Sequence, residues 1–279
     1  LVYLSISGFG QTGPRAAEPG YDFLVQAMGG VMSLTGDPDG QPVKVGVGIA
    51  DVMCGMYASV GVLAALRHRD RTGRGQHIDL ALYDAQVAWL INAATNFLAS
   101  GSAPRRFGNA HPNIVPYQVF ETADGHVVIA VGNDAQYGRL CDTLGRPELA
   151  TDERFRTNSD RLRHRDALVD LLTACTRTRT TDAWVSMLKQ AMVPVGPVNT
   201  LDRVFDDPQT KHRGMQIDMA HPASPDGVRL LGNPLKMSET PVLYRRPPPM
   251  RGQHTDEILD ELGIDRSQRD EWRRDAVIE

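Results

Sequence analysis

An aspartate at the start of an apolar helix is the residue best placed to do chemistry. The chain passes from an extended, β-branched segment at residues 43–48 through Asp51 into an uncharged run at residues 52–66. A carboxylate in this position either caps the helix or acts as a nucleophile held at the helix's positive end. On residue type alone the cap is the commoner role, so the flanking residues must decide between the two.

The composition is that of a soluble globular protein. The chain has 279 residues, of which 41% are hydrophobic and 23% charged, enough for one large or two ordinary domains. The net charge of −4 argues against nucleic acid and anionic membranes as partners. No apolar run reaches the ~18 residues of a membrane span, and no signal peptide is visible.

The cysteines indicate a reducing compartment. Cys54, Cys141 and Cys175 are odd in number and widely spaced, which suits neither a disulfide framework nor a zinc site. We therefore expect a cytoplasmic protein without a metal.

Strand and helix patterns alternate through the first part of the chain. We expect strands at residues 1–7, 43–48 and 77–82, and helices from residue 52 to about 70 and over residues 83–99. This order predicts an α/β fold with parallel strand pairing. Because the chain opens inside a strand pattern and not with Met, we also expect it to be a fragment that lacks its beginning.

A hairpin opens the second part of the chain. Asp124-Gly125 separates two β-branched runs, residues 116–122 and 126–131, which is a strong hairpin signal. Helices are expected at residues 134–144, 161–176 and 181–190, the last one capped by Thr180 or Thr181. The remainder is irregular and Pro-rich and ends in a charged amphipathic tail. The predicted domains are residues 1–103, 104–203 and 204–279.

Familiar catalytic motifs are missing from the sequence. It has no phosphate loop ending in Gly-Lys-Ser/Thr, no His-Glu-x-x-His helix and no Gly-x-Ser-x-Gly elbow. Residues 8–13 nearly match the dinucleotide fingerprint, but Pro14 makes a poor helix start and no acidic residue follows at the required place. We interpret this segment as a loop that needs flexible glycines.

Several segments in order resemble the class III CoA-transferase family, which includes 2-methylacyl-CoA racemases and carnitine-CoA transferase-like proteins. The matching segments are residues 5–14, 20–30, 46–51, 72–82, 108–113 and 252–263. The resemblance covers essentially the whole chain. It implies a Rossmann-like large domain whose first strands are missing here, a small α+β domain, and an interlocked homodimer. It also implies that most CoA-binding residues precede this sequence.

The resemblance implies that Asp51 is the nucleophile. Its carboxylate would attack a succinyl-CoA-like thioester and form an acyl-aspartyl anhydride, then an aspartyl-CoA thioester, before CoA moves onto an acceptor carboxylic acid. Covalent catalysis divides one difficult exchange into easier steps, and a helix N-terminus favours the ionised carboxylate. In this context the nucleophile is favoured over the cap. The CoA thioester is then a substrate, and no tightly bound cofactor is expected.

Tyr21 separates the branches of the family. The racemases have a His at the matching position, and a phenol with an ordinary pKa of about 10 is a poor base for an α-proton. This favours a transferase, in which Tyr21 either bonds the acyl group or CoA or packs under its loop. Asn109 and His111 are expected in a loop that closes over the acyl group.

Two arginines and the form of this loop bear on the substrate. The glycine-rich version of the loop is absent, which argues against an oxalate-type enzyme. By closeness of overall pattern, the resemblance implies dicarboxylates such as succinate, glutarate or a C4–C5 hydroxy or unsaturated diacid as the acids. Arg105 and Arg106 are candidate partners for a second carboxylate. The alternatives are a 2-methylacyl-CoA racemase, a carnitine-CoA-type enzyme, or an inactive CoA-binding fragment.

Overall fold

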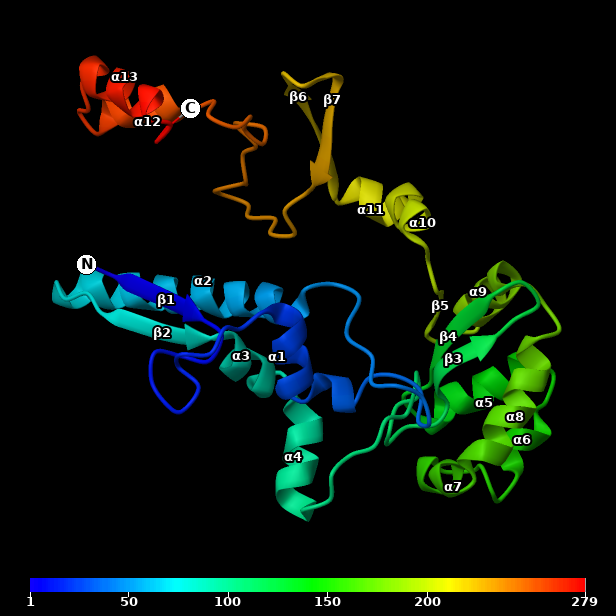
Figure 1. Cartoon of the computed structure of the whole chain (residues 1–279). Helices are drawn as coiled ribbons and strands as arrows, with labels where there is room; N and C mark the ends of the chain where they lie inside the picture. The colour runs from blue at the N-terminus through cyan, green and yellow to red at the C-terminus, as the bar shows by residue number, and fades with distance from the viewer. Residues whose placement is uncertain (279) are drawn as a thin grey trace. The chain divides into compact units, whose positions relative to one another are not determined.

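The chain divides into two compact units, Leu1–Val198 and Asn199–Glu279 (Figure 1). The structure is a computed structural model that describes residues 1–278. Helices and three small sheets alternate along the chain, which confirms the predicted mixed α/β class.

Two parallel strands and a long helix form the N-terminal part of the first unit. Strand β1 (Tyr3–Ser7) pairs with β2 (His77–Ala81), with Tyr3 opposite His77 and Ser7 opposite Ala81. Helix α2 (Ile49–Thr72) lies along this pair (Figure 1). The predicted parallel pairing is therefore confirmed, and α2 belongs to the crossover that such pairing requires.

Two short helices, α1 (Asp22–Met28) and α3 (Leu82–Ala88), pack against the beginning of α2. The 3₁₀ helix η1 (Val31–Ser33) follows α1, and α4 (Ile91–Ser100) follows α3. A small buried cluster joins α1, α2 and α3, and it consists of Val25, Ala50, Cys54, Leu82 and Ala85. Since Ala50 and Cys54 flank Asp51 in the sequence, this cluster fixes the turn that carries the predicted nucleophile.

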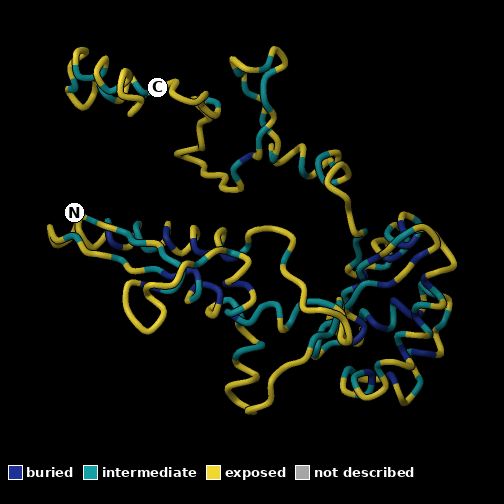
Figure 2. The backbone as a smooth tube through the Cα atoms, in the orientation of Figure 1, coloured by how far each residue is buried: buried dark blue, intermediate teal, exposed yellow. Residues whose placement is uncertain are grey.

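The body of α2 is largely exposed within the described chain, although its sequence is apolar. Figure 2 shows mostly exposed backbone along it. Its exposed large apolar side chains are Val52, Met56, Tyr57, Val60 and Leu63. By length and composition alone α2 could also cross a membrane, a test that core helices of soluble proteins pass as well.

Three predicted elements differ from the structure. Residues 43–48 are irregular and form no strand, because the Val45 N–H donates to the side chain of Gln26. The predicted helix 83–99 is divided into α3 and α4, and Ile91 at the break has a positive φ of 33°. The predicted helix 161–176 is likewise two helices, which meet at His164.

A three-stranded antiparallel sheet and its helices make the second part of the first unit. Strands β3 (Tyr117–Glu121) and β4 (His126–Ala130) form the predicted hairpin, and β5 (Val195–Pro197) pairs with β4. The helices are α5 (Asp134–Thr143), α6 (Glu148–Thr151), α7 (Asn158–Arg163), α8 (Arg165–Thr176) and α9 (Thr181–Gln190), the last capped by Thr180 as predicted. They enclose the larger hydrophobic core, visible as buried backbone in Figure 2.

A buried arginine ties the start of this sheet to its helices. Arg161 is 1% exposed and donates from Nε to the Val115 carbonyl at 2.7 Å and from a terminal nitrogen to Asp134 at 2.7 Å. Its guanidinium also lies 4.3 Å from the centre of the Tyr137 ring. The segment that leads from the predicted substrate loop into β3 is therefore fixed from inside the core.

The second unit contains short elements. They are α10 (Leu201–Asp206), α11 (Pro208–His212), the hairpin β6 (Gln216–His221) and β7 (Ser224–Leu231), α12 (Thr255–Glu261) and α13 (Arg266–Arg274). Over residues 199–278, Gly232 is the only buried residue. This unit therefore has no hydrophobic core of its own.

Candidate functional site

Asp51 is the third residue of α2, inside the first helical turn and not at the cap position. The N-cap is Gly48, and the Asp51 side chain is exposed. Within residues 1–278 the Asp51 carboxylate makes no hydrogen bond and no ion pair. The positive end of the helix macrodipole stabilises a negative charge at this place. An accessible carboxylate without a partner is suited to attack an electrophile.

The cap of α2 comes from α1. Asp22 Oδ1 accepts a hydrogen bond from the Ala50 N–H at 2.8 Å, which satisfies one of the free amides of the first turn. Asp22 Oδ2 accepts a second bond from Gln26 Nε2 at 2.7 Å. Because Gly48 has no side chain, Asp22 takes the role that an N-cap side chain usually has.

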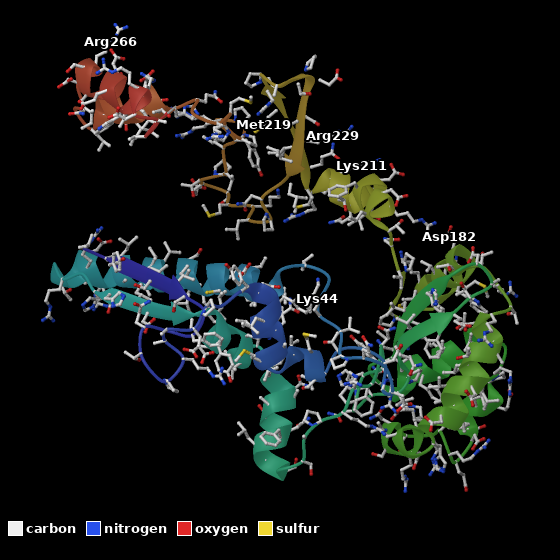
Figure 3. All side chains as sticks on the ribbon, viewed as in Figure 1. Lys44, Asp182, Lys211, Met219, Arg229 and Arg266 are labelled. Atoms are coloured by element: carbon white, nitrogen blue, oxygen red, sulfur yellow. The ribbon has the colours of Figure 1, made fainter. Side chains whose placement is uncertain are left out.

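Gln26 holds the segment that precedes Asp51. Its side chain is fully buried, with 0% exposure. Its Oε1 accepts from the Val45 N–H at 2.9 Å, and its Nε2 lies 3.4 Å from the Val47 carbonyl. Figure 3 labels the neighbouring Lys44 on this segment. The route into α2 is thus fixed by one buried amide in place of strand pairing.

Gly48 separates the two carboxylates. A Cβ at this position would lie 3.7 Å from Asp22 Cγ and 3.7 Å from Asp51 Oδ2. Asp22 and Gln26 were missed by sequence reasoning, because their contacts reach residues far along the chain. The available signal was their own i,i+4 spacing on one helix, which brings two side chains to the same face.

Tyr21 lies close to this cluster in sequence and in space. It is the N-cap residue of α1, directly before Asp22, and its side chain is 75% exposed. The preceding Gly20 packs against Gly8. A Cβ added to Gly20 would lie 2.4 Å from the Gly8 Cα. Only glycines allow this approach, so the loop with the partial dinucleotide pattern supports the start of α1.

The loop with Asn109 and His111 is anchored by its own contacts. The centre of the His111 ring lies 5.3 Å from that of Tyr117, with the two rings tilted by 57°, and His111 Nδ1 accepts from the Asn113 N–H at 3.1 Å. Asn109 is exposed. Across the part of the chain that the structure describes, no hydrogen bond joins either residue to Asp51. The structure therefore brings Tyr21 and Asp51 to neighbouring helix starts and leaves Asn109 and His111 on a separate loop.

Arg106 connects this loop to the segment that leads toward Asp51. It donates to the carbonyls of Asp37 at 2.9 Å, Pro38 at 3.2 Å and Gly40 at 2.6 Å. The Gly108 N–H donates in the same place to the Gly36 carbonyl at 3.1 Å. The guanidinium of Arg106 is thus engaged with backbone oxygens, and the suggestion that it receives a substrate carboxylate is not supported.

A thiol lies one turn beyond Asp51. Burial, and secondarily the charge of Asp51, raise the pKa of Cys54. Cys54 is therefore a protonated thiol that does not compete as a nucleophile. Among residues 1–278 no three His, Cys, Asp or Glu side chains are grouped so that they could hold a metal ion.

Comparison with known proteins places the chain in a family. The model of CoA-transferase family III matches residues 1–255. The succinate–glutarate CoA-transferase of Agrobacterium fabrum is 46% identical over 94% of this chain and 65% of its own length. The human succinyl-CoA:glutarate CoA-transferase is 38% identical over 94% of this chain and 60% of its own length.

A solved structure agrees with these sequence relatives. The crystal structure of a CaiB/BaiF family protein from Brucella suis has a TM-score of 0.83 and is 48% identical, covering 94% of this chain and 68% of that one. The chain spans 60 to 65% of the length of the two curated relatives named above. With an exposed aspartate at the head of α2 and these matches, the chain belongs to CoA-transferase family III.

Proposed function

We propose that the full-length protein transfers CoA from a succinyl-CoA-like donor to a dicarboxylic acid such as glutarate, with Asp51 as the nucleophile. The observation that carries this proposal is the exposed, unpartnered Asp51 carboxylate in the first turn of α2. Relatives named as succinyl-CoA:glutarate and succinyl-CoA:mesaconate CoA-transferases support the choice of acids.

The reaction would proceed through two kinds of covalent intermediate on Asp51. A carboxylate oxygen attacks the thioester carbonyl carbon, a C–O bond forms, the C–S bond breaks, and CoA leaves as a thiolate. The thiolate then attacks Asp51 Cγ of the anhydride, giving aspartyl-CoA thioester and free succinate. Glutarate attacks that thioester, and the released thiolate takes the glutaryl group from the new anhydride. Asp51 is regenerated and no proton is consumed.

Tyr21, Asn109 and His111 are proposed substrate-binding residues. Tyr21 directly precedes α1, the helix that caps α2, and its phenol is exposed, which supports a place for it beside the ligand. A phenol is a poor base for an α-proton, which supports CoA transfer over racemisation. Asn109 and His111 would border the acyl group from their loop.

The proposed assembly is an interlocked cytoplasmic homodimer with a Rossmann-like large domain, without nucleic-acid or membrane partners. The exposed apolar side chains of α2 support a further covering layer of protein. Light scattering of the full-length protein should give the mass of two chains, whereas the mass of one chain would contradict the dimer.

A trapping experiment tests the nucleophile. The full-length protein is incubated with succinyl-CoA, quenched with hydroxylamine and digested for peptide mass spectrometry. A hydroxamate is expected on Asp51 and should disappear in Asp51→Ala. Asp84→Ala is the matched control, because Asp84 is also an exposed aspartate in the first turn of a helix, α3.

The opposite outcome is equally specific. If Asp51 stays unmodified while solvent deuterium enters the α-carbon of a 2-methylacyl-CoA, the protein is a racemase and not a transferase. If neither signal is seen, the full-length protein has neither activity and the CoA-transfer proposal is rejected for these acids.

A further inference from the structure

Asp51 and Asp160 both occupy the third position of a helix, but their carboxylates differ in their hydrogen-bond partners. Asp160 is the third residue of α7, and its Oδ2 accepts from the Thr157 N–H at 3.2 Å and from the Thr157 hydroxyl at 2.6 Å. The Thr157 hydroxyl accepts in turn from the Asp160 N–H. This is a capping box, in which the carboxylate is turned back onto the helix start.

The capping box changes the chemistry of that carboxylate. The hydrogen bond from the Thr157 side chain is the main cause that lowers the pKa of Asp160. A carboxylate whose lone pairs are shared with two donors is a weaker nucleophile than a free one. Asp160 Oδ1 also accepts from Arg163, so this carboxylate combines a local cap with an ion pair, and neither kind of contact is made by Asp51 within residues 1–278.

Asp51 avoids this arrangement because the residue three positions before it is Gly48. No side chain is present there to form a box, and the Ala50 N–H is satisfied by Asp22 Oδ1 from a different helix. The buried Gln26 side chain donates from Nε2 to Asp22 Oδ2 and so holds the Asp22 carboxylate in place. The start of α2 is therefore capped without any use of the Asp51 carboxylate.

We propose that Asp22 is a positioning residue for the covalent step: it caps α2 from outside the helix and so leaves the Asp51 carboxylate free to attack the thioester. This inference rests on the proposed function, because it concerns the reactivity of the same nucleophile. It also assigns a role to Gly48, which has no side chain and therefore cannot form a local cap that would bind the Asp51 carboxylate.

A single substitution converts one arrangement into the other. Gly48→Ser should form a capping box with Asp51 once ψ at this residue, 68° in the structure, moves toward the 160° of Thr157. The backbone permits a serine there, because φ at Gly48 is −70° and an added Cβ would come no closer than 3.7 Å to its neighbours. In the full-length protein, Tm should stay the same or rise. The rate of Asp51 hydroxamate formation with succinyl-CoA should fall about tenfold, the factor that corresponds to one capping interaction.

The complementary variants remove the external cap. Asp22→Ala should lower the trapping rate about 100-fold, as expected when a reacting group loses its orientation. Asp22→Asn keeps an acceptor for the Ala50 N–H and should retain more of the rate than Asp22→Ala. In both variants kcat, expressed per folded molecule, should fall by a larger factor than KM for succinyl-CoA rises. A general loss of folded protein would leave kcat per folded molecule unchanged.

Three outcomes would overturn the inference. Gly48→Ser could react at the wild-type rate, or Asp22→Ala could do so. The double variant Asp22→Ala/Gly48→Ser could restore Tm and rate together, in which case Asp22 only stabilises the helix. If the wild-type protein itself gives no Asp51 hydroxamate, the proposed function fails; if it does and the variants match it, only the role of Asp22 fails.

Discussion

At the scale of single residues, the surroundings of a side chain decide its reactivity more than its type. Asp51 and Asp160 have the same chemistry and the same helical position, yet one is free and the other is bonded to Thr157. The same contrast divides the three cysteines, of which Cys54 and Cys141 are buried and Cys175 is partly exposed. Burial raises the pKa of Cys54, and it raises that of Cys141 to about 11.

We expect Cys175 to be alkylated first in the native protein. Iodoacetamide reacts with thiolates that solvent can reach, so Cys54 and Cys141 should remain unmodified until the protein unfolds. Peptide mass spectrometry after a short reaction at neutral pH, with and without denaturant, measures this order. Rapid labelling of Cys54 in the folded protein would show that the start of α2 opens in solution.

At the scale of elements, local signals were sufficient where neighbouring residues decide the structure. The β3–β4 hairpin follows from Asp124-Gly125, and α9 follows from its Thr180 cap. The start of α2 could be located to within a few residues of Asp51, so the sequence was also informative about the site.

Distant contacts were the part that the sequence could not provide. The segment at residues 43–48 has a strand-like composition, but its backbone is held by Gln26, and no strand lies beside it. The cap of α2 is likewise made by Asp22, 28 positions before Ala50. Propensity describes a residue and its neighbours, and such tertiary contacts override it.

The connection made by Arg106 leads to a prediction at this scale. Arg106→Gln removes three hydrogen bonds that join the loop of Asn109 and His111 to residues 37–40. KM for the acceptor acid should rise about tenfold, because the three bonds are exposed and each contributes about 0.5 kcal/mol. The Gly108 amide, bonded to the Gly36 carbonyl, should exchange faster with deuterium.

Arg177→Gln is the control for this prediction, since Arg177 only forms an exposed ion pair with Glu121. Such surface pairs contribute little to stability. Unchanged kinetics and unchanged Gly108 exchange in Arg106→Gln would show that the loop holds its place without this arginine.

At the scale of the whole molecule, the two parts of the first unit differ in how much core they contain. The β3–β4–β5 sheet and its helices bury a large cluster around Phe120, Ile129 and Leu168. The N-terminal part buries only a small one around Val25 and leaves the side chains of α2 exposed. The site at Asp51 thus lies on the part of the first unit that has the smaller core.

The second unit has an even smaller amount of buried apolar core. This leads to a prediction for residues 199–279 as an isolated segment. Its helices α12 and α13 have 7 and 9 residues, shorter than the ~12–15 at which isolated helices become marginally stable. The ion pair of Arg273 with Asp256 is partly exposed and adds little. Circular dichroism should therefore show a largely unordered chain without a cooperative thermal transition. Residues 104–198, which contain the larger core, should melt cooperatively under the same conditions. A cooperative transition of the isolated segment 199–279 would show that its short elements can fold without an apolar core.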